Sequence, residues 1–355
     1  MTNSYIGLLT KCQAPFRVKR AWLEWVADDR ESMRAAIIVP GDKGGHVEVR
    51  TVPDLTPSAG QVLVRVRASG LNRGEIGQVK SLQTGNPSSI GVEFAGEVAA
   101  VGANVSTWRE GDRVMGHGRG GQAQYTLADP RALMRVPPNL SWTEAASFPN
   151  VFVTAHDAVV TNGQLRAGEA ILVNAASSGV GLAAIQIASW LEAKPIIATT
   201  RSTSKIEKLS PYGIDVAIDT SRQSQVDAVM DATAKKGVDV IIDCVGGTVF
   251  EDNLASLAVK GRLVNIGRLG SSTAHFDISQ LWLKRLKLIG VTFRTRSEEE
   301  RLACIQACAR DLLVPLAAGR LRWPIERTFP LEQLAEAHAY MERDQHFGKI
   351  VITID

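Results

Sequence analysis

The second half of the chain alternates short apolar runs with segments of helical periodicity, and this alternation limits the fold more than any other feature. Six runs follow one another: AILVN, PIIATT, VAID, VDVIIDCVG, GRLVNIG and LKLIGVTF. Helices are expected between them, starting near Val180, Ser204, Val226 and Leu254. Parallel neighbours in a sheet need such crossover helices, so the pattern predicts an α/β fold with a doubly wound parallel sheet. We assign residues 154–299 to this domain.

The flanking sequence has a different pattern, in which strands predominate. Before residue 154, alternating runs such as QVLVRVRASG and EFAGEVAAVG are separated by turn residues, which predicts a mostly β domain. After residue 299, two helical stretches lead to FGKIVITI, whose strand we expect to return to that domain. The second domain is therefore predicted to comprise residues 33–153 and 300–355. Residues 1–32 are expected to be an extension, either disordered or a transit segment, because basic residues without acids fill its first part.

Composition excludes several classes of protein. The 355 residues are enough for two domains with a sizeable core. With 40 Lys and Arg against 37 Asp and Glu, the formal charge of +3 is too small to favour nucleic acid or an anionic membrane as a partner. No apolar run reaches the roughly 18 residues that a membrane span needs. The four cysteines, Cys12, Cys244, Cys304 and Cys308, indicate neither a disulfide framework nor a zinc site, so a reducing, cytoplasmic location is expected.

The segment VNAASSGVG links the first apolar run to the first helix and has the context of a dinucleotide-binding turn. Ala176 and Ser178 stand where the fingerprint G-x-G-x-x-G has its first two glycines, but Gly181 fills the third position. Gly179 adds backbone freedom, and the Ser178 hydroxyl can donate to a phosphate. Ser178, Gly179, Val180 and Gly181 are therefore predicted to bind a pyrophosphate at the helix N-terminus. A purely structural strand-to-helix turn is the alternative.

The second apolar run indicates which dinucleotide this turn holds. It ends in TTRSTSK, with Thr200 where an NAD-selective site carries an acid for the ribose 2′-hydroxyl. Arg201, Ser202 and Lys205 follow, and they supply a planar fork, a hydroxyl and a point charge suited to a 2′-phosphate. Cations oppose the dipole at a helix N-terminus, so a nearby anion explains them better than a solvated helix start does. The sequence thus predicts NADP(H) as the cofactor.

The order and spacing of several short motifs resemble those of one enzyme family. From Met33 onward, the chain resembles the zinc-independent quinone oxidoreductases, which include ζ-crystallin-like proteins, within the medium-chain dehydrogenase/reductase superfamily. The resemblance rests on SGLNRGEIGQ, GVEFAGEVAAVG, EGDRVMG, ILVNAASSGVGLAAIQIA, DCVGG, VNIGRLG, GVTFRTRS and FGKIVI. It implies a Rossmann NADP-binding domain, a GroES-like substrate domain and a homodimer in which LKLIGVTF is the edge strand.

The resemblance also implies that no metal takes part. Zinc-dependent relatives place a cysteine where this chain has Asn72 and a histidine near Val92, and both ligands are missing. The structural zinc loop, with four closely spaced cysteines, is missing as well. No two histidines stand at ligand spacing, so none is assigned a function; they are His46, His117, His156, His275, His338 and His346.

The same resemblance assigns residues to the cofactor and to the substrate. Thr154 matches the family threonine near the nicotinamide. Asn72 matches the family asparagine at the cleft, where we expect it, as the catalytic residue, to orient the nicotinamide or the substrate carbonyl. Further residues match loops that line the cofactor after strand ends, where open α/β sheets bind ligands; they are Cys244, Val245, Ile266, Gly267 and Phe293.

The reaction expected at this site is one that needs neither a metal ion nor an acidic side chain, because the sequence indicates neither. Without a metal or an obvious acid, the substrate must need little beyond orientation against the nicotinamide. Quinones and activated α,β-unsaturated carbonyls meet this condition, because hydride addition gives a delocalised oxyanion, whereas simple alcohols usually need a Lewis acid. We therefore expect NADPH-dependent quinone or enone reduction.

Two alternatives to that activity stay open. The first is an enoyl thioester reductase, although the tyrosine proton donor of such enzymes in this family is absent from GQVKSLQTGNPSSIG, so another donor would be needed. The second is a non-catalytic NADPH-binding protein, either a sensor or a structural protein. Turnover of different acceptors separates these possibilities.

Overall fold

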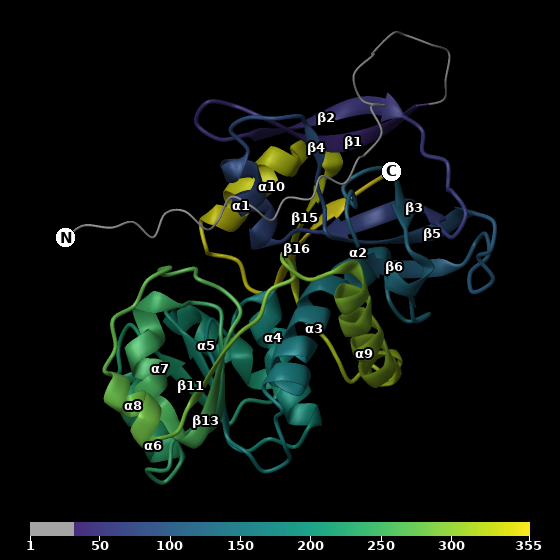
Figure 1. Ribbon diagram of the computed structural model, residues 1–355. Helices are drawn as coiled ribbons and strands as arrows, with labels where there is room; N and C mark the ends of the chain where they lie inside the picture. The colour runs from purple at the N-terminus through teal and green to yellow at the C-terminus, as the bar shows by residue number, and fades with distance from the viewer. Residues whose placement is uncertain (1–31) are drawn as a thin grey trace. The chain divides into compact units, whose positions relative to one another are not determined.

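The computed structural model describes residues 32–355, which contain three β-sheets and the helices around them (Figure 1). The extension predicted for residues 1–32 lies, apart from Ser32, outside the described residues. None of the helices within residues 32–355 combines the length and the apolar composition needed to cross a membrane.

One sheet has six parallel strands, as the alternation in the sequence predicts. The strands are ordered β11-β10-β9-β12-β13-β14, and each neighbouring pair is parallel. Their bounds are β9 (Ile171–Val173), β10 (Ile196–Thr200), β11 (Val216–Asp219), β12 (Val238–Asp243), β13 (Leu257–Asn265) and β14 (Lys287–Gly290). The chain order reverses between β9 and β12, so the sheet is doubly wound and the predicted fold class is confirmed.

Helices connect consecutive strands of this sheet. They are α4 (Gly179–Trp190), α5 (Thr203–Leu209), α6 (Gln225–Ala232), α7 (Phe250–Ser256) and α8 (Ile278–Leu283), with the short turns η3 (Ser210–Tyr212) and η4 (Gly247–Val249). The first four begin near the positions predicted from the sequence, whereas α8 was not expected. Every residue of β9 and β10 is buried, which explains why these strands have continuous apolar sequences instead of alternating ones.

The other two sheets form the β-rich part of the molecule. One has the order β15-β16-β3-β5-β6-β8, with β7 paired to β3, and the smaller one has the order β2-β1-β4. Their strands are β1 (Ser32–Val39), β2 (His46–Pro53), β3 (Val62–Gly70), β4 (Ser88–Ser89), β5 (Glu93–Val101), β6 (Arg113–His117), β7 (Tyr125–Ala128), β8 (Leu133–Arg135), β15 (Ile325–Pro330) and β16 (Lys349–Thr353). The accompanying helices and turns are α1 (Arg73–Ser81), α2 (Trp142–Ala146), α10 (Leu334–Glu342), η1 (Pro130–Ala132) and η5 (Leu331–Gln333), whereas the π-helix η2 (Asp157–Asn162) packs against α4 and β13.

The carboxyl-terminal strand returns to the β-rich part, as FGKIVITI predicts. Strand β16 is antiparallel to β3, with Val351 opposite Gly70, and parallel to β15. In Figure 1 the yellow strand β16 accordingly lies between β15 and the blue strand β3. Strands that are about 280 residues apart in the sequence thus meet in one sheet: Gly70 of β3 lies opposite Val351 of β16.

Two helices and one apolar core join the parallel sheet to the β-rich part. Helix α3 (Pro149–His156) packs against α9 (Glu298–Ala317). The predicted domain boundary between residues 153 and 154 falls inside α3. The largest apolar cluster contains Met115 of the β-rich part together with Leu182 of the parallel-sheet part. This continuous core fixes the position of side chains that lie between the two parts.

Candidate active site

The loops that follow the parallel strands lie at the carboxyl edge of that sheet, so predicted cofactor residues from distant parts of the sequence come together there. They are Ser178 after β9, Arg201 after β10, Cys244 after β12, Gly267 after β13 and Phe293 after β14. The strand order reverses between β9 and β12. Doubly wound sheets bind their ligands at such a reversal, outside the carboxyl ends of the strands.

The turn between β9 and α4 leaves an open helix N-terminus. Ser178 is the N-cap residue, and its Oγ accepts a hydrogen bond from the Gly181 N–H at 3.1 Å. The N–H groups of Gly179 and Val180 have no partner within residues 32–355, as expected for the first residues of a helix. A Cβ atom at Gly181 would lie 2.6 Å from the Ala175 carbonyl oxygen, so only glycine lets the helix approach the strand this closely. The turn therefore fits a bound pyrophosphate.

A segment near the carboxyl terminus lies against this turn. Ser178 forms an isolated β-bridge with Gly348, whose N–H donates to the Ser177 carbonyl at 3.0 Å. A Cβ atom at Gly179 would lie 2.9 Å from Cδ of Lys349. The start of β16 therefore connects the turn directly to the β-rich part.

The two cations after β10 differ in what they contact. The Arg201 side chain is 83% exposed, and its nearest acidic partner is Asp344, with Nη2 4.0 Å from Oδ2. Lys205 instead donates to the main-chain carbonyls of Asp344 at 2.9 Å and His346 at 2.8 Å. Ser202 is the N-cap residue of α5 but makes no capping bond with its side chain. Arg201 is thus the more accessible cation, and Lys205 holds the segment that leads to β16.

Thr200 ends β10 and is buried, and an acid lies beside it on the neighbouring strand. The Thr200 Oγ1 accepts from the Ser202 N–H at 3.3 Å. Its partner in the strand register is Asp219, whose carboxylate accepts from Ser221 Oγ at 2.6 Å and from Thr203 Oγ1 at 2.5 Å. These hydrogen bonds hold the pKa of Asp219 below its ordinary value. Both oxygens of this acid are therefore engaged by residues of the adjoining loops.

The loops after β12 and β13 are held together by Asp243. Its Oδ1 accepts from the Val245 N–H at 2.7 Å, and its main-chain carbonyl accepts from the Ile266 N–H at 2.7 Å. A Cβ atom at Gly267 would lie 2.7 Å from the Cys244 carbonyl oxygen, so the two loops touch. Burial raises the pKa of the Cys244 thiol to about 12, so the thiol is neutral near pH 7.

On the β-rich side, Asn72 lies in a buried network with an ion pair at its centre. The Lys349 Nζ donates to Glu93 Oε1 at 2.7 Å and to Asn72 Oδ1 at 3.0 Å. The Asn72 amide nitrogen donates to Glu93 Oε1 at 2.8 Å and to the Gly70 carbonyl at 3.1 Å. Asn150 Nδ2 donates to Asn72 Oδ1 at 2.8 Å. The Asn72 amide thus uses both hydrogens and both lone pairs inside the protein.

A second buried carboxyl, that of Glu75, lies next to this network. Its Oε1 accepts from the Val92 N–H at 3.0 Å, and its Oε2 accepts from Gln122 Nε2 at 3.0 Å and from the Asn72 N–H at 3.3 Å. Burial raises the pKa of Glu75 to about 7, although the Lys349 charge acts in the opposite direction. Glu75 therefore titrates near neutral pH beside Asn72.

Asn150 connects this network to the loops of the parallel sheet. His117 Nε2 lies 3.1 Å from Asn150 Oδ1, and the His117 ring centroid is 5.4 Å from that of Phe293. Burial lowers the pKa of His117, so the neutral ring donates through Nε2 to the amide oxygen. Thr154 follows Asn150 by one turn of α3 and is buried. The structure thus links Asn72 to Phe293 through Asn150 and His117.

Sequence reasoning missed the residues that hold this network, which are Glu75, Glu93, His117, Asn150 and Lys349. One signal was present, because lysine is almost never fully buried without a partner, yet Lys349 opens the apolar run KIVITI. Its partner Glu93 is 256 positions away in the sequence. Only the pairing of β16 with β3, and of β3 with β5, brings the two side chains together.

Known proteins share this architecture. The family descriptions "Alcohol dehydrogenase GroES-like domain" and "Zinc-binding dehydrogenase" match residues 58–138 and 179–307. The chain is 30% identical over 345 residues to "Quinone oxidoreductase-like protein 2" of Bos taurus, which covers 95% of this chain and 97% of that protein. The chain belongs to the medium-chain dehydrogenase/reductase superfamily. The resemblance to quinone oxidoreductases inferred from the motifs is thereby confirmed.

Two solved structures extend this result. A quinone oxidoreductase from Pseudomonas syringae pv. Tomato DC3000 has a TM-score of 0.81 and 26% identity, covering 91% of this chain and 100% of that chain. The CurK enoyl reductase has a TM-score of 0.79 and 28% identity, covering 92% of this chain and 100% of that chain. The superfamily consists of oxidoreductases that use a nicotinamide cofactor, and the open N-terminus of α4 fits its pyrophosphate.

Proposed function

We propose that this chain is an NADPH-dependent, zinc-independent oxidoreductase that reduces quinones or activated α,β-unsaturated carbonyl compounds by hydride transfer. The observation that carries the proposal is an open helix N-terminus after β9 together with an exposed arginine after the adjacent strand β10. Gly179 and Val180 offer N–H groups to the pyrophosphate, and Arg201 offers a planar fork to the 2′-phosphate. When bound there, the cofactor supplies the hydride.

The chain's own residues orient the reactants. Lys349 and Glu93 fix Asn72, which in turn fixes Asn150 and, through it, His117. Asn72 is therefore proposed to act as a positioning residue. Further residues are proposed to line the cofactor; they are Thr154, Thr200, Ser202, Lys205, Cys244, Val245, Ile266, Gly267 and Phe293. A quinone or enone held in this way needs no Lewis acid, because the added hydride leaves a delocalised oxyanion that solvent protonates.

The buried ammonium group supports the zinc-independent part of the proposal. Asn72 stands where zinc-dependent relatives carry a cysteine, and its oxygen lies 3.0 Å from Lys349 Nζ. A fixed cation at this distance repels a divalent ion. Within residues 32–355, moreover, no three His, Cys, Asp or Glu side chains are grouped so that they could hold a metal ion.

Steady-state oxidation of NADPH and of NADH with a quinone, an enone and an enoyl thioester tests this function. We expect the highest kcat/KM for NADPH with a quinone or an enone. A rise in melting temperature on adding NADPH, without turnover of any acceptor, would favour the non-catalytic alternative. If NADPH does not raise the melting temperature and no acceptor is turned over, the result would contradict the assignment of the turn after β9 to a cofactor.

An enoyl thioester reductase is the second candidate, because the structure of CurK enoyl reductase is similar to that of this chain. The segment that carries the tyrosine donor in such enzymes reads GQVKSLQTGNPSSIG here and contains none. A different group would have to deliver the proton. Faster turnover of a crotonyl-type thioester than of any quinone would select this candidate over quinone reduction.

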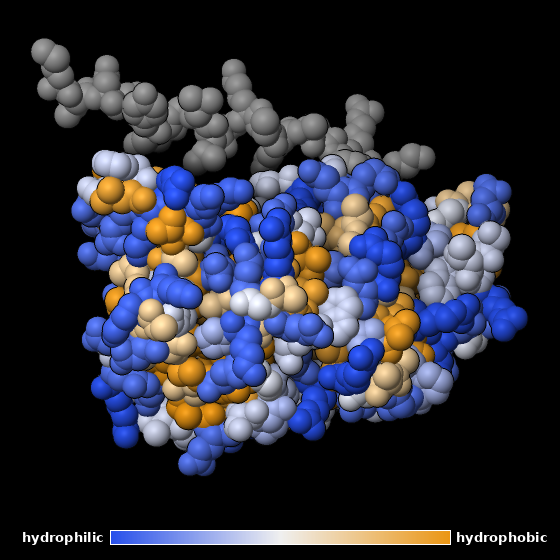
Figure 2. Space-filling model, turned by 90° about the horizontal axis from the view of Figure 1, so that it is seen from below, coloured by the Kyte–Doolittle hydropathy of each residue, from blue (hydrophilic) through white to orange (hydrophobic). Residues whose placement is uncertain are grey.

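We also propose that the chain forms a homodimer through β14. This strand is at the edge of the parallel sheet. Leu288 on β14 is 40% exposed, and Ile278, Trp282 and Leu283 of α8 are exposed by 60% or more. Apolar groups also emerge between hydrophilic ones on the face shown in Figure 2. An unpaired edge beside apolar side chains favours pairing with a second copy, and light scattering should give twice the mass of the chain. The cytoplasmic location stays a prediction.

A further inference from the structure

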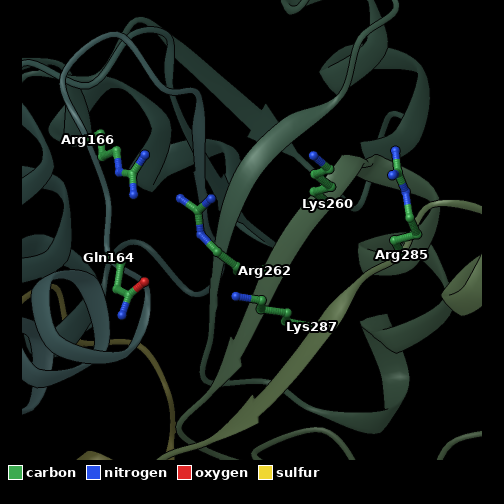
Figure 3. A pocket seen from close by; sticks show the side chains of 6 residues that line it. All are labelled: Gln164, Arg166, Lys260, Arg262, Arg285 and Lys287. Atoms are coloured by element: carbon green, nitrogen blue, oxygen red, sulfur yellow. The ribbon is translucent and has the colours of Figure 1, made fainter.

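A second cluster of charge lies at the amino edge of the parallel sheet, opposite the loops of the candidate active site. A hollow of about 250 Å³ is lined there by Gln164, Arg166, Lys260, Arg262, Arg285 and Lys287 (Figure 3). These residues come from the turn before β9, from β13, from the turn between α8 and β14, and from the first residue of β14. Arg262 and Lys287 are partners in the register of β13 and β14, so the two strands bring cations to one place. We call this site the basic hollow.

One of these cations already has a structural role. The Arg262 guanidinium donates to both oxygens of Glu169, at 3.1 Å and 2.5 Å, and its Nε donates to the Gly163 carbonyl at 2.7 Å. Nearby Lys284 is used in a similar way, because its Nζ donates to three main-chain carbonyls at the end of α7. The charges of Arg262 and Lys284 therefore stabilise the fold itself.

The other four cations of the basic hollow have no such role. Arg166, Lys260, Arg285 and Lys287 are exposed. None of them forms an ion pair with an acid of residues 32–355, and the only carboxylate paired at the hollow is that of Glu169 with Arg262. Like charges gathered around one small volume repel one another. A multivalent anion in the hollow would remove that repulsion.

Three of the residues that line the basic hollow have an uncommon backbone conformation. Gln164, Lys260 and Arg285 adopt positive φ angles of 48°, 65° and 53°. Positions in this left-handed region favour glycine or asparagine, and other residues are uncommon there. Three of the six lining residues thus occupy backbone positions that would more readily carry a short residue, and all three have long polar side chains instead.

We propose that the basic hollow binds a small molecule that carries a diphosphate or two closely spaced phosphate groups. Arginine forks form paired hydrogen bonds with phosphate oxygens, and lysines add point charges. A small concave site suits a compact ligand, whereas a nucleic acid requires an extended basic surface. Because the hollow is at the amino edge of the sheet, its ligand is distinct from the cofactor proposed at the carboxyl edge.

Calorimetric titration with inorganic pyrophosphate tests this site. We expect one binding event at the hollow in the wild type, weakened about a hundredfold in Arg166→Gln/Lys260→Gln, because each lost charge-assisted hydrogen bond accounts for about a factor of ten. Arg262 is left intact, since its loss would leave Glu169 unpaired. The single variant Arg166→Gln, expected to weaken binding about tenfold, serves if the double variant does not fold.

Two control variants separate the hollow from other sources of binding. Lys43→Gln/Arg320→Gln removes the same amount of charge from exposed positions elsewhere and should bind pyrophosphate like the wild type. Arg201→Glu alters the proposed cofactor site and should retain the binding event at the hollow. Full binding of pyrophosphate in Arg166→Gln/Lys260→Gln would place the anion elsewhere, such as at the N–H groups of Gly179 and Val180, and would overturn the proposal. Absence of any binding to the wild type would also overturn it.

A lipid headgroup is another source of phosphate, and sedimentation with vesicles distinguishes it from a soluble ligand. The probes are phosphatidylcholine vesicles with and without phosphatidylserine. We expect the wild type to stay in the supernatant with both. Sedimentation that requires phosphatidylserine and is lost in Arg166→Gln/Lys260→Gln, together with no pyrophosphate binding, would replace the small molecule by a membrane surface.

Discussion

Two groups of charged residues in this chain use their charge in different ways. Lys349 and Glu93 are almost completely buried, and the ammonium group donates to Glu93, to Asn72 and to the Leu71 carbonyl. The Arg201 side chain is 83% exposed, and its nearest acid is 4.0 Å away. The charges of Lys349 and Glu93 are paired with each other inside the protein, whereas the charge of Arg201 is available to a ligand.

The difference shows how burial decides what a charge does. A buried ion pair loses its hydration, and this cost is offset only when every hydrogen and lone pair finds a partner. An exposed charge keeps its hydration, so it contributes little to stability on its own. Changes in the buried network should therefore alter the free energy of unfolding, whereas changes at Arg201 should alter binding alone.

The largest effect is expected from Lys349→Met. This change leaves the Glu93 carboxylate buried without its cation, and removal of one partner of a buried pair costs about 3–5 kcal/mol. Urea unfolding of the variant and the wild type measures the loss of unfolding free energy. The double variant Glu93→Gln/Lys349→Met removes both charges and should recover a large part of that loss. A loss below about 1 kcal/mol in Lys349→Met would contradict the central role of the pair.

The next effect concerns the pH dependence of Glu75. Its pKa in the folded protein is about 7, above the ordinary value of 4.5. Between these values the folded protein keeps a proton that the unfolded chain releases, so the free energy of unfolding falls as the pH rises. The fall is expected to be about 3 kcal/mol between about pH 4.5 and about pH 7, and Glu75→Gln should abolish it.

The effect of Glu75 is obtained by comparing the pH dependence of the free energy of unfolding in the wild type and in Glu75→Gln. His338 and His346 have pKa values lowered to about 4 by burial, so they make the free energy of unfolding rise with pH up to the ordinary histidine value. That contribution is common to the wild type and Glu75→Gln and cancels when the two are compared. Equal pH dependence in both proteins would mean that Glu75 keeps an ordinary pKa.

A smaller effect, on binding alone, is expected from Arg201→Glu. Loss of a charge-assisted hydrogen bond to the 2′-phosphate should raise KM for NADPH about tenfold to a hundredfold, corresponding to about 1.5–3 kcal/mol. KM for NADH and the melting temperature should hardly change, because Arg201 is exposed. Arg320→Glu, an equal change at an exposed position at the end of α9, is the control. An equal rise of KM for both cofactors would argue against a 2′-phosphate contact.

The parallel sheet could be predicted from the sequence because its information is local. Each of the six strands is a short apolar run bounded by helical segments, and burial on both faces makes the runs of β9 and β10 continuous. Even the return of FGKIVITI to the β-rich part was predictable as a further strand. The α8 helix was missed because it is short and much of its apolar surface is exposed, so it lacks the pattern of a buried face.

The network around Asn72 could not be predicted, because it depends on contacts between residues that are far apart in the sequence. Glu93 and Lys349 each resemble an ordinary charged residue in a strand, and only the order of β16, β3 and β5 makes them partners. The prediction that Asn72 contacts the reactants came from its match to the family asparagine at the cleft. The structure shows that its amide group is fully hydrogen-bonded within the protein, which no pattern in the sequence reveals.

The smallest effect is expected at Ser178, whose hydroxyl could serve the fold, as Lys349 does, or a ligand, as Arg201 does. Its hydroxyl oxygen accepts from the Gly181 N–H and so caps α4, yet its hydrogen remains available to a phosphate. If the Ser178 hydroxyl only caps α4, Ser178→Ala should lower the free energy of unfolding by about 1 kcal/mol and Ser178→Gly by only a few tenths of a kcal/mol. The KM for NADPH should then be unchanged in both variants. If the Ser178 hydroxyl instead binds a phosphate of the cofactor, both variants should raise the KM for NADPH to a similar degree. Urea unfolding and NADPH kinetics on the two variants therefore decide whether this residue uses its hydroxyl for the fold or for the cofactor.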